Sequence, residues 1–189
     1  MADPAFAPLV VDQNTALHFA NTQLAGPLFE LFESERYYLA PWLPWLQLPQ
    51  TLDETKQMIW EQQLFNQGGQ RMTTFIAHRE QLVGMLGFVR FDKRHHLGEL
   101  GYWLARKYQG KGLMTNCCKK LLQYSFQELQ LNRVELRIPA NNPRSLKLAQ
   151  RLHFTGEGTL RQAFLQDGRY QDVEVFSLIK EEFNTKFLF

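Results

Sequence analysis

One short segment, Gln109-Gly110-Lys111-Gly112-Leu113-Met114, has residue types and spacing that point directly to chemistry. It follows an apolar and aromatic run at 97–104, which has the length and composition of a β-strand. A run with helical periodicity follows it and ends at Phe126. A glycine turn between a strand and a helix exposes several backbone N–H groups at the positive end of the helix dipole. The segment therefore predicts an anion site, most naturally for phosphate.

Two common phosphate-binding loops do not match this segment. A nucleoside-triphosphate loop needs Ser or Thr directly after its lysine, whereas Lys111 is followed by Gly112. A dinucleotide fingerprint needs a small residue at the position of Thr115 and an early place in a βαβ unit. A plain strand–turn–helix junction without a ligand remains the alternative.

The composition is that of a globular chain that buries a full core. The 189 residues are 44% hydrophobic and 13% aromatic, and 21 Lys and Arg against 19 Asp and Glu give no sign of a nucleic-acid groove. The only cysteines, Cys117 and Cys118, are adjacent and predict reduced core residues, with no metal site. We find no export signal and no run of 18 apolar residues, so we expect a soluble, cytoplasmic protein without a membrane partner.

The hydrophobic periodicity predicts a mixed order of helices and strands. Apolar spacing indicates a first helix from Leu24 that ends before Tyr37, and a second helix over 53–67 that Gly68 and Gly69 stop. The aromatic loop at 37–45 contains two prolines and is expected to bury its tryptophans as a lid or a pocket wall. The remaining expected elements are a short strand near 9–11 or 17–19, strands over 72–78, 82–91, 97–104 and 133–138, helices ending at 126 and beginning at 143, and strands over 159–165 and 170–179.

The glycine segment resembles the Gln/Arg-x-x-Gly-x-Gly/Ala pyrophosphate loop of the GCN5-related N-acetyltransferase (GNAT) superfamily, with Met114 in the last position. Asn142-x-x-Ser145 resembles that family's second cofactor motif, although His153 replaces the glycine that closes it. The stretch Leu39-x-x-Trp42-Leu43-Pro44-Trp45 is similar to the RimJ/RimL branch, which includes N-terminal acetyltransferases of ribosomal proteins. Further matching pieces are Gly101-Tyr102-Trp103-Leu104 and Asp167-Gly168-x-Tyr170-x-Asp172.

The resemblance covers about residues 15–180 and implies an α/β fold. We expect residues 1–189 to form a single N-acetyltransferase domain, with a mostly antiparallel sheet of about seven strands and about four helices. In this fold the fourth and fifth strands splay apart, and the pantetheine arm of acetyl-CoA lies between them. Acetyl-CoA is therefore the expected co-substrate.

The resemblance also implies roles for particular residues. N–H groups from Gln109 through Thr115 would hold the pyrophosphate, with Lys111 adding a screened charge, and backbone of the strand would pair with the pantetheine amides. One strand N–H would polarise the thioester carbonyl. The predicted cofactor-binding residues are Tyr102, Trp103, Leu104, Gln109, Gly110, Lys111, Gly112, Leu113, Met114, Thr115, Asn142 and Ser145.

Two residues are candidates for catalysis. Glu99 is the candidate general base, acting directly or through water, because an acid among apolar neighbours takes up a proton more readily than one in water. Ser145 matches the residue proposed to protonate the leaving thiolate in the ribosomal-serine branch, and Tyr170 is a second candidate for that role. The structural alternatives are a solvent-facing strand residue for Glu99 and a local hydrogen bonder for Ser145.

We expect an N-acetyltransferase that acts on the N-terminal α-amine of a protein or peptide, with a ribosomal protein as the branch's characteristic acceptor. The alternatives are a small amine, such as a polyamine, aminoglycoside or amino acid, and a non-catalytic acyl-CoA-binding module. Phe164 stands where a carboxylate is expected in the ribosomal-serine branch, which weakens the case for the same acceptor. The exposed aromatics at 37–45 would suit a homodimer or a substrate lid.

Overall fold

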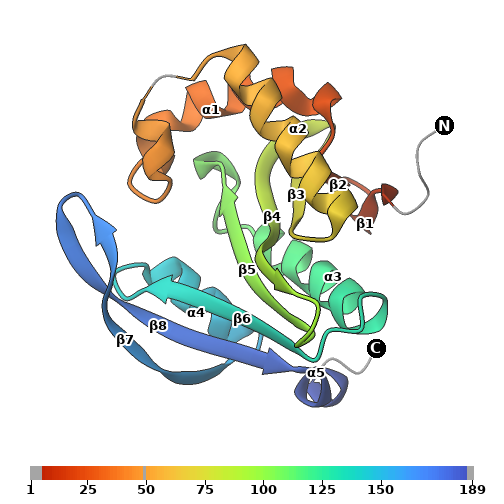
Figure 1. Ribbon diagram of the computed structural model, residues 1–189, viewed down its shortest axis with the longest axis vertical. Helices are drawn as coiled ribbons and strands as arrows, with labels where there is room; N and C mark the ends of the chain where they lie inside the picture. Colours follow the sequence, from red (N-terminus) through yellow and green to blue (C-terminus); the bar gives the residue numbers. More distant parts are fainter. Residues whose placement is uncertain (1–5, 49, 187–189) are drawn as a thin grey trace.

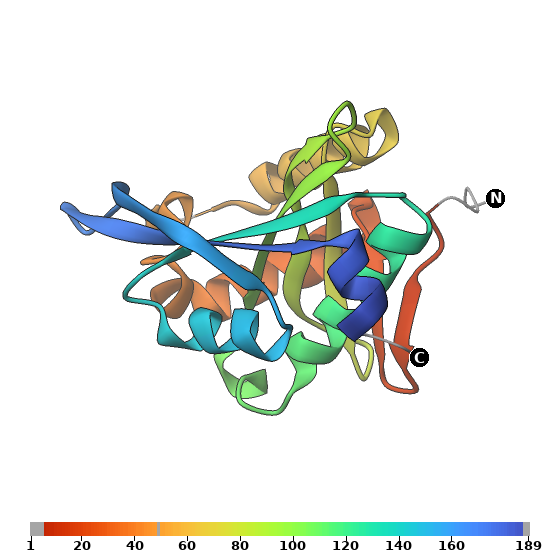
Figure 2. The same ribbon diagram turned by 90° about the horizontal axis from the view of Figure 1, so that it is seen from below.

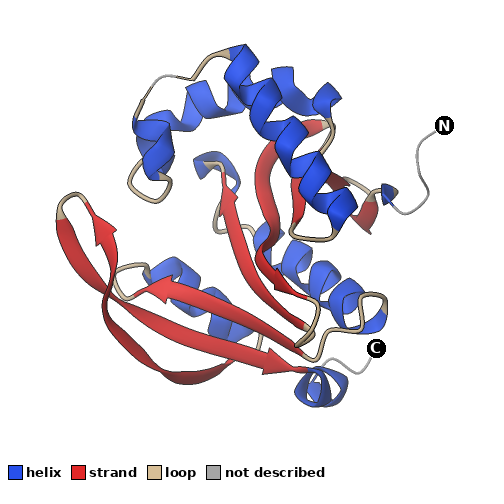
Figure 3. Ribbon diagram, viewed as in Figure 1, coloured by secondary structure: helices blue, strands red, loops and turns tan. Residues whose placement is uncertain are grey.

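One mixed sheet forms the centre of the computed structural model, which describes residues 6–48 and 50–186 (Figures 1 and 3). Within these residues the sheet has eight strands in the order β1-β2-β3-β4-β5-β6-β8-β7. The strands are β1 (Leu9–Asp12), β2 (Thr15–Phe19), β3 (Met72–His78), β4 (Gln81–Asp92), β5 (Leu97–Leu104), β6 (Arg133–Pro139), β7 (Thr155–Gln166) and β8 (Arg169–Ile179). The α-helices are α1 (Ala25–Leu39), α2 (Leu52–Gly68), α3 (Leu113–Gln127), α4 (Pro143–Arg151) and α5 (Lys180–Lys186).

The expected α/β class and element order are confirmed. Thr51 and Glu54 form a capping box at the start of α2, and Gly69 ends the helix with a left-handed φ of 60°. Strand β4 lies between β3 and β5, and its apolar residues on both faces suit this central place. Both candidate N-terminal strands form, so the fourth and fifth strands of the expected fold are β5 and β6 here.

Two expectations about local structure were wrong, and one segment for which no structure was predicted is helical. Helix α1 continues through Tyr37 to Leu39 instead of ending before the aromatic segment. Pro44 then starts a 3-10 helix, η3 (Pro44–Gln47), because proline fits the first position of a helix, where its missing N–H has no partner. The tail gave no pattern, yet it forms α5, whose Phe183 stacks on Phe126 with ring centroids 4.8 Å apart.

The helices cover the two faces of the sheet and create two cores. Helices α3 and α4 pack on one face, where Leu100 and Leu104 of β5 are buried with them, and Figure 2 shows β6 and β8 crossing over α4. Helices α1 and α2 pack on the other face around Phe75 and Trp103. Consecutive residues of β5 therefore point into different cores, as strand geometry requires.

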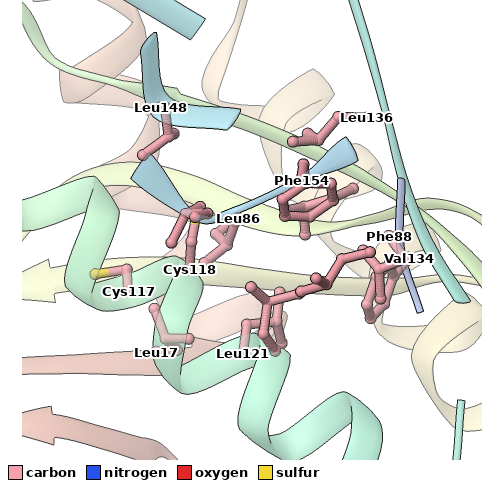
Figure 4. Close-up of a cluster of buried hydrophobic side chains, with 14 of the residues drawn as sticks. Leu17, Leu86, Phe88, Cys117, Cys118, Leu121, Val134, Leu136, Leu148 and Phe154 are labelled. Carbon is pink, nitrogen blue, oxygen red and sulfur yellow. The ribbon is translucent and has the colours of Figure 1, made fainter. Parts of the chain in front are cut away.

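The two cysteines lie in the larger core, as expected (Figure 4). Both are fully buried on α3, facing Leu17 and Leu86 of the sheet. Burial raises the pKa of the Cys117 thiol to about 12 and raises that of Cys118 well above its usual range. The thiols are therefore inert packing groups.

An ion-pair cluster joins the strands at the β7 edge of the sheet. The Arg133 guanidinium on β6 donates two hydrogen bonds to Glu157 on β7, and Ser177 of β8 donates a third at 2.7 Å. These donors lower the pKa of Glu157 from 4.5 to about 2. The cluster thus fastens β6, β8 and β7 to one another through a single carboxylate.

We predict that Glu157→Gln destabilises the fold in a pH-dependent way. Because the pKa of Glu157 is lower in the folded state, its contribution is complete above about pH 4.5 and is lost as the pH falls toward 2. The unfolding free energies of wild type and variant, measured in urea, should differ most at neutral pH and converge at acid pH. Glu80→Gln, at an exposed turn, is the control. A difference that does not depend on pH would contradict the prediction.

Candidate active site

The sheet opens between β5 and β6 (Figure 1). These parallel strands pair only at Leu97↔Arg133, Gly98↔Val134 and Glu99↔Glu135, although β5 continues to Leu104 and β6 to Pro139. On their outer sides both strands remain paired, β5 with β4 and β6 with β8. The result is a V-shaped gap whose wide end lies where the two strands finish.

The backbone of β5 presents hydrogen-bonding groups to this gap. Ala105 N–H donates to Val83 of β4 at 2.8 Å, whereas the Leu104 carbonyl faces away from β4 and accepts from Gln109 Nε2 at 2.8 Å. The backbone N–H and C=O groups of successive residues point alternately to the two sides of a strand in an antiparallel ladder. Those of Tyr102 therefore also face the gap, and those of Trp103 face β4. Three residues were expected to pair with pantetheine through their backbone. The backbone of Trp103 is turned away from the gap, whereas that of Tyr102 and that of Leu104 face it.

The glycine segment forms an open concave loop at the wide end. Gly110 and Gly112 have φ angles of 73° and 78°, and a Cβ at either would meet nothing within 4 Å, so the loop is unobstructed. Asn116 N–H donates to the Gly112 carbonyl at 3.1 Å, which leaves the N–H groups at 113–115 without a helical acceptor. Gln109 N–H, expected in the cradle, is already bonded to the Arg106 carbonyl at 3.3 Å.

These features fit a diphosphate. Unpaired N–H groups point outward at the start of the 15-residue helix α3, whose first turn carries no acidic residue. Lys111 is exposed beside them and adds a positive charge. An anion bound here would be held by backbone donors and by the helix dipole. The residues at 110–115 thus stay predicted contacts of the pyrophosphate of acetyl-CoA, whereas the N–H and the side chain of Gln109 are bonded within the protein.

The second motif forms the start of α4 as expected. Asn142 is its N-cap and accepts a hydrogen bond from Ser145 N–H at 3.2 Å. His153, which replaces the usual glycine, adopts a left-handed φ of 57° after the helix, so the turn is kept without glycine. The motif therefore retains its helix start and its chain reversal.

Tyr102 extends from β5 toward Ser145. Its phenol oxygen is buried and has no hydrogen-bond partner among the described residues. Burial raises the pKa of Tyr102 above its usual range, and the neighbouring Ser145 hydroxyl opposes this effect. The structure thus brings Tyr102 and Ser145 together on the face covered by α3 and α4. Tyr170, the second acid candidate, is 65% exposed.

Glu99 lies on the opposite face of β5, at the narrow end of the gap. Its side chain is 19% exposed, and Oε2 is 3.5 Å from Nε of Arg137 on β6. Arg137 also approaches Glu135, with Nη2 3.8 Å from Oε2. The expectation that Glu99 lies among apolar neighbours was wrong on the β6 side, because the alternation of β6 places a guanidinium against this carboxylate.

The two tryptophans of the aromatic segment have different surroundings. Trp42 lines a pocket of about 790 Å³ together with Tyr38, Pro41 and Arg106. Trp45 packs edge-on against Phe32 at 5.2 Å but is 44% exposed. Trp42 thus has the expected role of a pocket wall, whereas full burial of both indoles was wrong.

Comparison with known proteins identifies the family. The model of the acetyltransferase (GNAT) domain matches residues 17–155, which is more than half of the chain. The chain belongs to this family. It is 27% identical over 169 residues to the ribosomal-protein-serine acetyltransferase of Escherichia coli (strain K12), covering 89% of this chain and 94% of that one.

Two further comparisons concern structure and acceptor. A RimL ribosomal L7/L12 α-N-protein acetyltransferase in complex with coenzyme A superposes with a TM-score of 0.89, at 25% identity, over 93% of this chain and 99% of that one. A spermidine N(1)-acetyltransferase of Vibrio cholerae is 29% identical over 105 residues, covering 56% of this chain and 61% of that one.

The family and the fold establish the reaction class. This GNAT protein is an acetyl-CoA-dependent N-acetyltransferase, and acetyl-CoA is its co-substrate. The expected superfamily and RimL-like branch are confirmed. Among the described residues, no helix is long and apolar enough to span a membrane.

Sequence reasoning missed several polar residues at the gap. Arg137 could have been found, because strict alternation on β6 puts it on the same face as Glu135, which pairs with Glu99. Tyr38 and Arg144, which both contact Gln109, gave no such signal. Their contacts join segments 71 and 35 positions apart, and local periodicity does not report such pairs.

We predict that Gly112→Ala weakens coenzyme A binding while the fold remains intact. Alanine at a φ of 78° is strained, and relief of that strain would misalign the N–H groups of the loop. A hydrogen bond to a charged group contributes about 1.5–3 kcal/mol, so the Kd for coenzyme A should rise about tenfold in calorimetry.

Gly26→Ala is the matched control for this variant. Gly26 lies in α1, its added Cβ would also meet nothing within 4 Å, and it has no left-handed φ. This variant should bind coenzyme A as wild type does. Equal Kd values for Gly112→Ala and Gly26→Ala would show that the loop does not hold the diphosphate.

Proposed function

We propose that this protein transfers an acetyl group from acetyl-CoA to the N-terminal α-amine of a protein or peptide, with a ribosomal protein as the leading candidate. The observation that carries the proposal is the near-complete alignment with the Escherichia coli ribosomal-protein-serine acetyltransferase, 89% of this chain and 94% of that one. The open β5–β6 gap supports it, because a thioester arm in the gap would present its acetyl group to the α1 and α2 face.

The charges at the narrow end of the gap argue against a polycationic acceptor. A polyamine needs carboxylates that are free to pair with it. Here Glu99 is paired with Arg137, and Glu135 accepts from Arg133 Nε at 2.9 Å and also lies near Arg137. The spermidine acetyltransferase relative keeps polyamines as the second candidate class, but this part of the groove offers them no unpaired acid.

The proposed mechanism is direct transfer. Acetyl-CoA supplies an acetyl group activated as a thioester. Backbone N–H of β5 facing the gap, such as that of Tyr102, polarises the thioester carbonyl. An α-amine has a pKa of about 8, so a minor neutral fraction attacks at neutral pH. The C–N bond forms, the C–S bond breaks, Glu99 takes the amine proton directly or through water, and the Ser145 hydroxyl protonates the thiolate.

Arg137 has a defined part in this scheme. Its guanidinium fixes the orientation of Glu99 and is itself shared with Glu135, so Glu99 does not hold the whole positive charge. The contact is a single ion pair at 3.5 Å and not a bidentate one. Glu99 is thus positioned without being fully neutralised.

We predict different losses for the two catalytic candidates. Glu99→Gln should lower kcat roughly 100- to 10,000-fold, the range typical of a general base. Ser145→Ala should lower kcat about 10- to 100-fold, because a thiolate leaves more readily than an alkoxide. Glu99→Gln should bind coenzyme A in calorimetry as wild type does, and Glu80→Gln should match wild type in every assay. Full activity of Glu99→Gln would remove it from the mechanism.

We also predict a preference for peptide α-amines. Thiol release from acetyl-CoA should be measured with Ser-, Ala- and Met-initiated peptides, the same peptides with blocked N-termini, spermidine and an aminoglycoside. Free peptides should be acetylated and blocked peptides should not. Faster turnover of spermidine than of every peptide would overturn the peptide proposal. Binding of coenzyme A without turnover of any amine would indicate a binding module.

A further inference from the structure

Three side chains from separate segments meet at the wide end of the β5–β6 gap. They are Tyr38 near the end of α1, Gln109 in the loop after β5, and Arg144 in the first turn of α4. Gln109 Nε2 donates to the Tyr38 hydroxyl at 2.6 Å, and Arg144 Nη1 donates to Gln109 Oε1 and lies 3.4 Å from the Tyr38 hydroxyl. We call these three residues the clasp.

The clasp bridges the wide end of the V-shaped gap between β5 and β6. Strand β5 leads into the loop that carries Gln109, and β6 leads into the helix start that carries Arg144. The Gln109–Arg144 hydrogen bond therefore joins the two diverging arms of the gap at its wide end, far from the three residue pairs at its narrow end. Gln109 also bonds the Leu104 carbonyl at 2.8 Å, so the clasp is anchored on β5 itself.

A second bridge holds the same part of α1 in place. Gln166, at the tip of the β7–β8 hairpin, donates from Nε2 to the Pro41 carbonyl at 3.1 Å. Its Oε1 accepts from Asn141, just before α4, at 2.7 Å. The turn after α1 is thus fastened to the β6 side of the gap independently of Tyr38.

The charge of Arg144 is not explained by the fold. Its side chain is exposed, and in the described part of the chain the oxygens that it contacts belong to an amide and a phenol, with no carboxylate within 4.0 Å. It lies in the first turn of α4, where the helix dipole disfavours a cation. Among the described residues only Nη1 of Arg144 makes a hydrogen bond, so its other donors are available to a ligand.

We propose that the clasp closes over the thioester arm of acetyl-CoA and holds it in the gap, so that Tyr38 and Arg144 are positioning residues for the cofactor. This inference rests on the proposed place of the arm between β5 and β6. With Gln109 and Arg144 in contact, the wide end of the gap is bridged, so an arm that lies in the gap leaves past this contact when it opens. The clasp therefore sets the dissociation rate of the cofactor.

The test compares Tyr38→Phe, Arg144→Gln and their double variant with wild type by stopped-flow displacement of coenzyme A. Tyr37→Phe is the matched control, because Tyr37 is the neighbouring tyrosine and is 94% exposed. Each single clasp variant should raise the dissociation rate about three- to tenfold, the effect of losing one hydrogen bond. The double variant should exceed neither single variant by more than about twofold, because both changes open the same ring.

A second measurement separates the arm from the phosphates. The KM for S-acetylpantetheine, which has the arm without the diphosphate, should rise in the clasp variants by a similar factor. Dissociation rates equal to that of Tyr37→Phe would overturn the clasp, and so would an effect confined to coenzyme A, which would make Arg144 a phosphate contact. If wild type itself fails to bind coenzyme A, the proposed cofactor site fails, and the clasp with it.

Discussion

The active site depends on one constraint, the parting of β5 and β6 after their third residue pair. A β-bulge between Phe88 and Arg90 of β4 lies directly opposite Glu99, and a bulge increases the local twist of the strands beside it. The last β5–β6 pair, Glu99↔Glu135, also places two carboxylates side by side, which is unfavourable without an intervening cation. The added twist and the repulsion between the two carboxylates therefore both favour separation of β5 from β6 after Glu99. The Arg137 guanidinium lies where this separation begins.

Parting the strands leaves backbone polar groups unpaired inside the sheet, and such groups need partners. The protein satisfies one of them itself, because Gln109 caps the Leu104 carbonyl. The others face a gap that an extended chain with amide groups can fill as an additional strand. The backbone groups that the separated strands leave unpaired thus offer a site for the cofactor arm. The glycine loop at the wide end adds donors for a charged group, which a strand lacks.

Much of this arrangement could be predicted from local sequence pattern. Strand β5 and helix α3 were predicted because their apolar spacing and the glycines between them are local signals, and the glycines that end α2 are a local signal as well. The extension of α1 was not predicted, because its last residues are retained by Leu39 packing in the core rather than by helix-forming pattern. The surroundings of Glu99 and the contacts of Gln109 depend on how distant segments are brought together, which no local window contains.

The sheet also separates two recognition tasks that could otherwise interfere. Tyr102 and Ser145 lie on the face of α3 and α4, and Glu99 and Trp103 lie on the face of α1 and α2. The two faces meet where β5 and β6 are apart. In the proposed mechanism, the walls that select the acceptor therefore share few residues with those that hold the cofactor. The relatives include a ribosomal-protein-serine acetyltransferase and a spermidine N(1)-acetyltransferase, so similar chains carry names with different acceptors. The clasp is the exception, because Tyr38 belongs to the acceptor face and touches the cofactor loop. An amino-acid substitution in α1 that alters the preference for the acceptor would therefore also alter the dissociation rate of the cofactor.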